Sequence, residues 1–279
     1  MNNILILAGR EFRDGLRNRW VMSATLLLTL FALTLALLGS APTGEVKTSP
    51  LAVTVVSLSS LSIFLLPLMA LLLSHDAVVG DIERGTMALL LSYPVARTEV
   101  LIGKYLGHLG ILALATLIGY GIAGLLTQWV STGSLEADVQ TWLPWLVLMA
   151  SSILLGACFL ALGYLVSTCV HERPTAAGIA IGLWLFFVLI YDMAVLGILV
   201  ADQGRFLTPQ LLSWLLTINP ADVYRLINLT GFADTARFSG MAALSGHARL
   251  GLPALSAILL AWTVLPFVFA SLIFQRKQL

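Results

Sequence analysis

Long apolar runs separated by polar stretches dominate the pattern of this chain. Six of these runs are each long enough to cross roughly 30 Å of hydrocarbon as a helix that rises about 1.5 Å per residue. They cover residues 20–40, 52–74, 105–128, 143–168, 175–200 and 253–274. The pattern therefore predicts an all-α polytopic membrane protein with six transmembrane helices.

The first 19 residues have an amphipathic pattern instead. Apolar side chains share one face of this segment at helical spacing, and three arginines share the opposite face. The arginines are Arg10, Arg13 and Arg17. This pattern predicts a helix over residues 1–19 that lies in the membrane surface with its arginines at the lipid headgroups. The alternative is the charged start of a signal peptide, but the following run has the length of a full span, so we expect an uncleaved anchor.

The longest polar interruption in the first half of the chain covers residues 75–104. It carries helix signals of its own, because Thr86 is placed to cap a short helix that Pro94 ends, and Thr98 is placed to cap a second helix. The residues at 87–91 form an apolar patch that a solvated loop does not require. Of the two interpretations, a solvated loop and a docking surface for a partner, the pattern favours the docking surface.

The distribution of lysine and arginine predicts the orientation. Six spans place both ends of the chain on one side of the membrane. If that side is cytoplasmic, ten of the 15 Lys and Arg residues lie on the inner side and five on the outer side, as the positive-inside rule requires. We therefore expect cytoplasmic termini, a cytoplasmic segment at 75–104 and a long outer loop at 201–252.

Two other polar segments are candidate contact sites. The inner turn between the fourth and fifth spans is either a simple reversal or a second partner contact. Its charged and titratable residues are His171, Glu172 and Arg173. The outer loop carries two helical patches and is either a lid on the bundle or a platform for an extracytoplasmic partner. Its candidate docking residues are Leu211, Trp214, Leu215, Asp222, Tyr224 and Arg225.

Asp192 is the one acid placed well within a predicted span. A charge in the hydrocarbon region is costly, which indicates a role in a transport pathway or in charge pairing. The alternative is that the helix ends earlier, so that Asp192 reaches the outer interface. The pattern leaves these two interpretations equal.

Glycine recurs in the third and fifth spans. Small residues at such spacings let neighbouring helices approach closely. These glycines are Gly107, Gly110, Gly119, Gly121 and Gly124 in the third span, and Gly178 and Gly182 in the fifth. They predict a tightly packed bundle and fit a homodimer equally well.

Composition narrows the range of functions. The chain is 59% hydrophobic and 10% charged, against about 25% charged residues in soluble domains. With 15 Lys and Arg against 14 Asp and Glu, no basic excess indicates a nucleic-acid partner. The two cysteines and four histidines are scattered without metal-ligand spacing, so we expect no metal site.

Enzymatic motifs are also missing from the sequence. No Gly-x-x-x-x-Gly-Lys-Ser/Thr stretch is present, so we expect no nucleotide binding by this chain. An intramembrane aspartyl protease needs two carboxylates that share a proton, whereas Asp81 lies in a polar segment and Val78 stands where the motif of that class requires glycine. We expect no catalytic activity of its own.

An ordered set of residues occupies the segment between the second and third spans. The set is Asp81, Glu83, Arg84, Gly85, Thr86, Leu89, Leu90, Leu91 and Pro94. An acidic residue, a Gly-Thr pair, a leucine run and a proline in this order resemble the coupling region of ABC-2 type permeases. The resemblance implies a type V exporter-like permease fold. It also implies a separate cytoplasmic ATPase that holds ATP and magnesium and docks on this segment.

Residues 10–20, the segment at 75–104 and residues 219–228 together support a narrower resemblance. They are similar to the permease subunit of Nos-type ABC complexes, which mature the copper sites of bacterial nitrous oxide reductase. This resemblance implies a homodimer in the bacterial inner membrane, two ATPase subunits and a periplasmic copper-handling partner. Because histidine and methionine do not cluster, copper passage has no support from the residues. Force transmission, export of a sulfur species or another substrate, and a membrane scaffold without transport stay open.

Overall fold

The computed structural model describes residues 2–39, 50–132, 139–202, 208–230 and 251–277, and every element in these ranges is a helix. The helices over the predicted spans are α2 (Arg19–Gly39), α3 (Pro50–Ser74), α6 (Arg97–Thr132), α7 (Val139–Cys169), the run of α8 (Arg173–Leu185), η1 (Phe186–Ile190) and α9 (Tyr191–Asp202), and α14 (Leu252–Arg276). The predicted all-α fold class is confirmed.

The number of helices suited to crossing a membrane agrees with the hydropathy pattern. Among the described residues, five helices are long and apolar enough to span a bilayer. The helices α1 (Asn2–Arg17) and α2 meet at an angle of 71° and make a sixth span if they are counted together. The protein is therefore a polytopic membrane protein.

The two predicted helix caps are wrong. Gly85, with φ of 73°, holds the cap position of α5 (Thr86–Leu91), because a glycine adopts this left-handed conformation without a side-chain clash. The helix α6 begins before Thr98, at Arg97. Its third residue, Glu99, accepts a hydrogen bond of 3.1 Å from the amide of Ala96 and so satisfies a free donor at the helix start.

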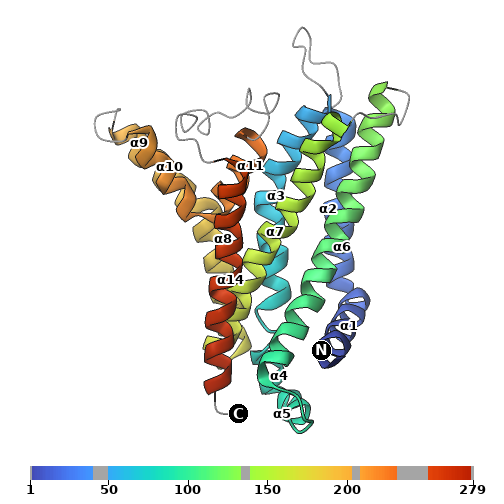
Figure 1. Ribbon diagram of the computed structural model, residues 1–279, viewed down its shortest axis with the longest axis vertical. Helices are drawn as coiled ribbons and strands as arrows, with labels where there is room; N and C mark the ends of the chain where they lie inside the picture. The colour runs from blue at the N-terminus through green and yellow to red at the C-terminus, as the bar shows by residue number, and fades with distance from the viewer. Residues whose placement is uncertain (1, 40–49, 133–138, 203–207, 231–250, 278–279) are drawn as a thin grey trace.

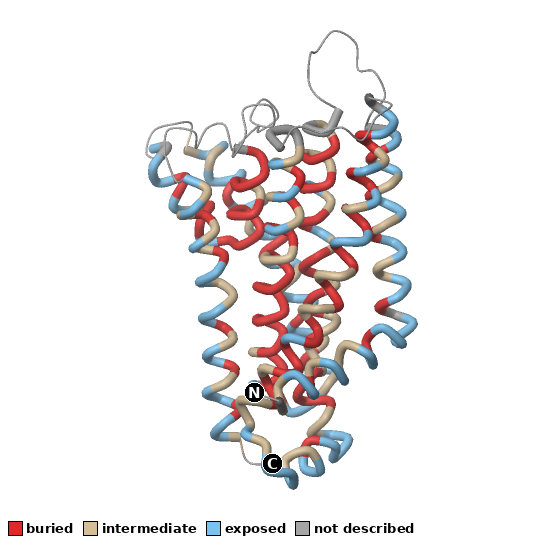
Figure 2. The backbone as a smooth tube through the Cα atoms, turned by 45° about the vertical axis from the view of Figure 1, so that its right-hand side comes forward, coloured by how far each residue is buried: buried red, intermediate tan, exposed pale blue. Residues whose placement is uncertain are grey.

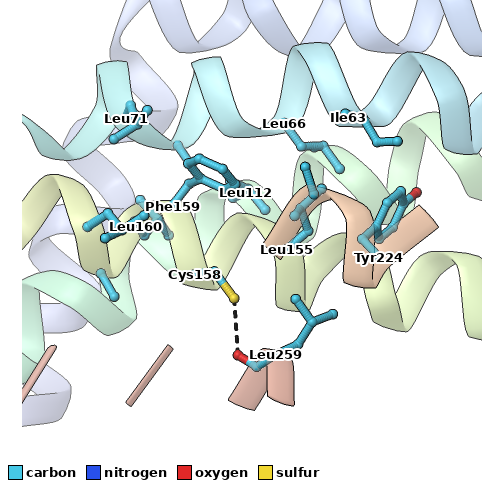
Figure 3. Packing of buried hydrophobic residues seen from close by; sticks show 14 of the residues in the cluster. Ile63, Leu66, Leu71, Leu112, Leu155, Cys158, Phe159, Leu160, Tyr224 and Leu259 are labelled. Carbon is cyan, nitrogen blue, oxygen red and sulfur yellow. Dashed lines mark hydrogen bonds between the residues drawn. The ribbon is translucent and has the colours of Figure 1, made fainter. Parts of the chain in front are cut away.

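The helix α7 is the centre of the bundle. In the most apolar 18-residue stretch of α7, 67% of the residues are buried. The corresponding stretches of the α8–α9 run and of α14 are 17% and 22% buried. Figure 2 shows the buried positions concentrated on the inner helices. Figure 3 shows α7 meeting α14, where the Cys158 thiol donates to the carbonyl of Leu259 at 3.1 Å. Cys158 is therefore a packing residue.

The glycines of α6 allow close contact with α1. A Cβ at Gly107 would lie 2.9 Å from the carbonyl oxygen of Ala8, and a Cβ at Gly103 would lie 3.1 Å from that of Ile4. Neither position has space for a side chain, so α1 is seated directly on the backbone of α6. By contrast, a Cβ at Gly178 of α8 would meet no atom within 4 Å.

The functional segments separate to the two ends of the bundle. Figure 1 shows α4 (Val79–Glu83), α5 and both chain termini at one end, which we call the α5 end. At the other end, the α11 end, α10 (Pro209–Ile218) leads back towards the bundle, and α11 (Pro220–Thr230) follows it. The described part of the predicted outer loop is thus a helical hairpin, and α11 packs against α3, α7 and α14.

Candidate functional site

The α4–α5 segment is a shaped element held by the bundle. The amides of Val78 and Val79, where α4 begins, donate to the Ser167 hydroxyl of α7 at 2.9 and 3.0 Å. The Thr86 hydroxyl donates to the carbonyl of Asp81 at 3.1 Å across the turn at Gly85. These bonds fix the direction of α5 relative to α7.

The outer face of α5 is open. Met87 is 1% exposed and anchors the helix, whereas Leu89 and the following Tyr93 are each 69% exposed. Of the other predicted coupling residues, Glu83, Arg84, Gly85, Thr86 and Pro94 are exposed, and Asp81, Leu90 and Leu91 are partly buried. An exposed leucine and tyrosine on a short fixed helix suit a protein contact, and this contact stays a prediction.

The structure brings the two predicted inner segments together through Arg173. Its Nε lies 3.1 Å from Oε2 of Glu83, and its Nη2 donates to the carbonyl of Gly80 at 2.6 Å. The amide of Arg173 also donates to Glu83 at 2.9 Å. The neighbouring His171 and Glu172 are exposed. The turn before α8 is therefore attached to α4.

Lys104 joins three helices at the α5 end. It is only 5% exposed. Its Nζ lies 2.5 Å from Glu11 of α1 and 2.8 Å from Asp81 of α4. Asp81 also accepts a hydrogen bond of 2.8 Å from Arg84. Glu11 is not among the predicted site residues, although a lysine inside an apolar helix signals that a carboxylate must lie nearby.

The ends of α6, α7 and α14 are also tied together. The Arg97 guanidinium donates to the carbonyls of Phe274 and Lys277 at 3.1 and 2.6 Å. Lys277 in turn donates to the carbonyls of Thr168 and Val170 at 2.9 and 2.6 Å. Burial lowers the pKa of Lys277 below its usual value. Since these cations satisfy carbonyls at helix ends, the three helices are held at fixed spacing at the α5 end.

At the α11 end, Asp192 is paired with Arg225. The helix does not end before Asp192 but continues to Asp202, so the interpretation of an early helix end is wrong. Arg225 donates to Asp192 and to Asp222, each at 2.6 Å. One guanidinium thus bridges α9 and α11 and compensates two carboxylates.

Asn219 links the hairpin to the π-helical turn η1. Its side-chain amide donates to the carbonyl of Phe187 at 2.8 Å and to Asp222 at 3.0 Å, and its side-chain oxygen accepts from the amide of Ala221 at 3.0 Å. A π-turn places backbone carbonyls out of the regular α-helical pattern, and such turns are frequent at functional sites. The Tyr191 hydroxyl adds a bond of 2.6 Å to the carbonyl of Leu215.

Two of the predicted outer docking residues lie inside the bundle. Tyr224 is 0% exposed and Asp222 is 2% exposed. The inner face of α11 meets the hydroxyls of α7, because Tyr224 bonds to Ser152 at 2.9 Å and Asn228 donates to Ser151 at 2.9 Å. Asp222 and Tyr224 therefore belong to no exposed surface in this conformation.

The outer surface of the hairpin is formed by other residues. Leu211 is 48% exposed and Trp214 is 65% exposed, whereas Leu215 and Arg225 are partly buried. These two exposed side chains lie one helical turn apart on α10. Docking of a partner on this surface stays a prediction.

Comparisons with known proteins identify the family. Residues 5–279 match the family described as ABC-2 family transporter protein. The chain is an ABC-2 transporter permease. This permease is 45% identical over 279 residues to a probable ABC transporter permease protein NosY of Stutzerimonas stutzeri, with 99% of each chain covered. It is also 46% identical over 277 residues to the protein of the same description from Pseudomonas aeruginosa, with 98% of each chain covered.

Membership of the ABC-2 family makes this chain a transporter subunit. An ABC permease is the membrane subunit of its transporter and works with an ATPase partner. Among the residues that the structure describes, no group of three or more His, Cys, Asp or Glu side chains is placed to hold a metal ion. The polar groups described at the two ends of this ABC-2 permease join helices to one another.

Proposed function

We propose that this permease couples ATP hydrolysis by two cytoplasmic ATPase subunits to work on a periplasmic partner, in the maturation of the copper sites of nitrous oxide reductase. The proposed coupling to ATP hydrolysis is supported by the attachment of α4 to the α8–α9 run, where Glu83 and Arg173 lie 3.1 Å apart. The proposed role in maturation of the reductase is supported by the similarity to proteins named NosY and by the resemblance of residues 10–20 and 219–228 to that group.

In this proposal the α5 end is cytoplasmic and receives the force. Each ATPase subunit of a homodimeric complex holds ATP and magnesium and seats on Leu89 and the α5 surface. Closure of the ATPases displaces α4 and α5, and Arg173 passes this displacement to α8. Lys104 passes it to α1 and α6, since the same ammonium group bonds to carboxylates of α1 and α4.

The α11 end delivers the motion. The helix α9 continues α8 through η1, and Asp192 and Phe187 of this run are bonded to Arg225 and Asn219 of the hairpin. A tilt of the α8–α9 run therefore moves α10 and α11. The periplasmic partner would sense this movement through the exposed Leu211 and Trp214 of α10.

The test is ATP hydrolysis by the purified complex of permease and ATPase, with and without the periplasmic partner. We expect the partner to change the hydrolysis rate, and Glu83→Lys to abolish this change, since lysine beside Arg173 replaces attraction by repulsion. Glu83→Gln is the graded comparison, because it removes the attraction to Arg173 without adding a positive charge, and we expect it to give an intermediate loss. Normal copper loading of the reductase by the Glu83→Lys complex would contradict the proposal.

Two other functions predict different results. A membrane scaffold keeps its output when ATP hydrolysis by the partner is silenced, whereas a force relay loses it. An ABC-2 exporter of another substrate hydrolyses ATP without a response to the periplasmic partner. The same preparations therefore separate the three functions.

A further inference from the structure

A cavity of about 640 Å³ opens at the α5 end between four elements. Its walls come from α1, the end of α3 with the residues that follow it, the α4–α5 segment and α6. They include Glu11, Asp76, Asp81, Arg84 and Lys104. The ion pairs of Lys104 with Glu11 and Asp81 form part of this wall. The proposed function does not say what occupies the cavity itself.

The charges around the cavity are unequal. Apart from His75 and His108, which also line the cavity, three cations, Arg10, Arg84 and Lys104, face four carboxylates, Glu11, Asp14, Asp76 and Asp81. Each cation has a carboxylate within reach in the wall itself: Lys104 bonds to Glu11 and Asp81, Arg84 to Asp81, and Arg10 to Asp14 at 3.6 Å. In the part of the chain that the structure describes, no Lys, Arg or His nitrogen lies within 4.0 Å of the Asp76 carboxylate. Asp76 is therefore the carboxylate in the cavity wall that has no cation partner among the described residues.

The rest of the wall defines the class of ligand. Leu72, Leu73 and Leu90 line the cavity together with Asp76. An apolar wall beside a single uncompensated carboxylate suits a long aliphatic stem that ends in a positive charge, as in lysine and arginine. The excess negative charge disfavours a phosphate group.

The position of α5 indicates where such a side chain would come from. Leu90 and Thr86 line the cavity, while Leu89 faces away from it and is 69% exposed. The helix α5 is thus one rim of the cavity, and a protein seated on Leu89 also lies at its mouth. We propose that the cavity accepts a lysine or arginine side chain of the ATPase partner, with Asp76 as its counter-ion. This inference rests on the proposed function, because it takes the ATPase to dock at α5.

The test compares the affinity of the permease for its ATPase at several salt concentrations. We expect Asp76→Asn to weaken binding by about fivefold to tenfold at low salt and to flatten its salt dependence, because one desolvated ion pair is lost. Asp76→Glu should restore most of the affinity. Asp14→Asn is the matched control, since Asp14 lines the same cavity but pairs with Arg10, and we expect a change of less than about twofold.

The failure of this inference is distinct from the failure of the proposed function. If wild type binds the ATPase and Asp76→Asn binds equally well with the same salt dependence, the cavity receives no cation from the partner and the inference is wrong. If wild type does not bind the ATPase at all, the proposed function fails with it. A rise in the melting temperature of the isolated permease with spermidine, lost in Asp76→Asn, would assign the cavity to a small free cation and overturn the docking of a side chain.

Discussion

The short helices at the two ends of the bundle are held by different means. At the α5 end, the Glu83 and Arg173 side chains are 35% and 33% exposed, so water can replace their contact at low cost. At the α11 end, the Asp192 and Arg225 side chains are each 25% exposed, but Asn219 and Tyr224 are each 0% exposed, so water does not replace their bonds at low cost. The contacts of Glu83 and Arg173 are therefore easier to exchange than those of Asn219 and Tyr224, as the proposed coupling requires.

Lys104 is the buried exception at the α5 end, and its replacement should have the largest effect on stability. Lys104→Met leaves Glu11 and Asp81 without their shared cation, which we expect to cost about 3 kcal/mol in the free energy of unfolding. Denaturant unfolding of the purified permease in detergent measures this loss. A change below about 0.5 kcal/mol, the range of exposed pairs, would show that the ends do not differ as described.

Asn219→Ala should have the next largest effect and should act locally. The carbonyl of Phe187 and the carboxylate of Asp222 each lose a donor inside the bundle, at a cost of about 2 kcal/mol. Hydrogen exchange over residues 209–230 should accelerate, while exchange in α5 stays as in wild type. Gln210→Ala, at an exposed position of α10, is the control. Equal acceleration in both variants would contradict a specific role of Asn219.

Arg173→Ala should change function more than stability. The pair with Glu83 is about one-third exposed, so we expect a loss of only about 0.5 kcal/mol in the free energy of unfolding. The response of ATP hydrolysis to the periplasmic partner should nevertheless disappear, because α4 and α8 are no longer attached. A variant that unfolds normally and keeps the full response would remove Arg173 from the relay.

Among these variants, Arg10→Ala should have the smallest effect on the stability of the permease. Its ion pair with Asp14 spans 3.6 Å between side chains that are 67% and 63% exposed. Exposed pairs one helical turn apart stabilise by about 0.3 to 0.5 kcal/mol at most. Thermal unfolding of the permease should be unchanged within error, and a clear loss would mean that α1 is held from its outer face as well as from α6.

The apolar runs predict the helices well, because the thickness of the hydrocarbon sets the length of a span. The run at 253–274 becomes α14 (Leu252–Arg276) almost unchanged. The pattern also separates the polar segment at 75–104 from a plain loop. It fails at the caps of α5 and α6, where a glycine and a back-reaching glutamate replace the expected threonines.

The pairings between helices lie beyond what the sequence pattern contains. Glu11 and Lys104 are far apart in the chain, and only the seating of α1 on the glycines of α6 brings them together. For the hairpin, an amphipathic pattern predicts one buried face but not the neighbour that covers it. The pattern therefore predicts an outer surface for Asp222 and Tyr224, whereas α11 turns them towards α7 and α9.

The π-turn η1 changes the phase of the helix that carries it. One residue corresponds to about 100° of rotation around a helix axis, so an extra residue within a turn rotates everything beyond it by that amount. The side of α8 that bears Gly178 is thus not continued by the matching side of α9. Deletion of one residue within Phe186–Ile190 would bring the two halves back into phase and would turn Asp192 away from Arg225.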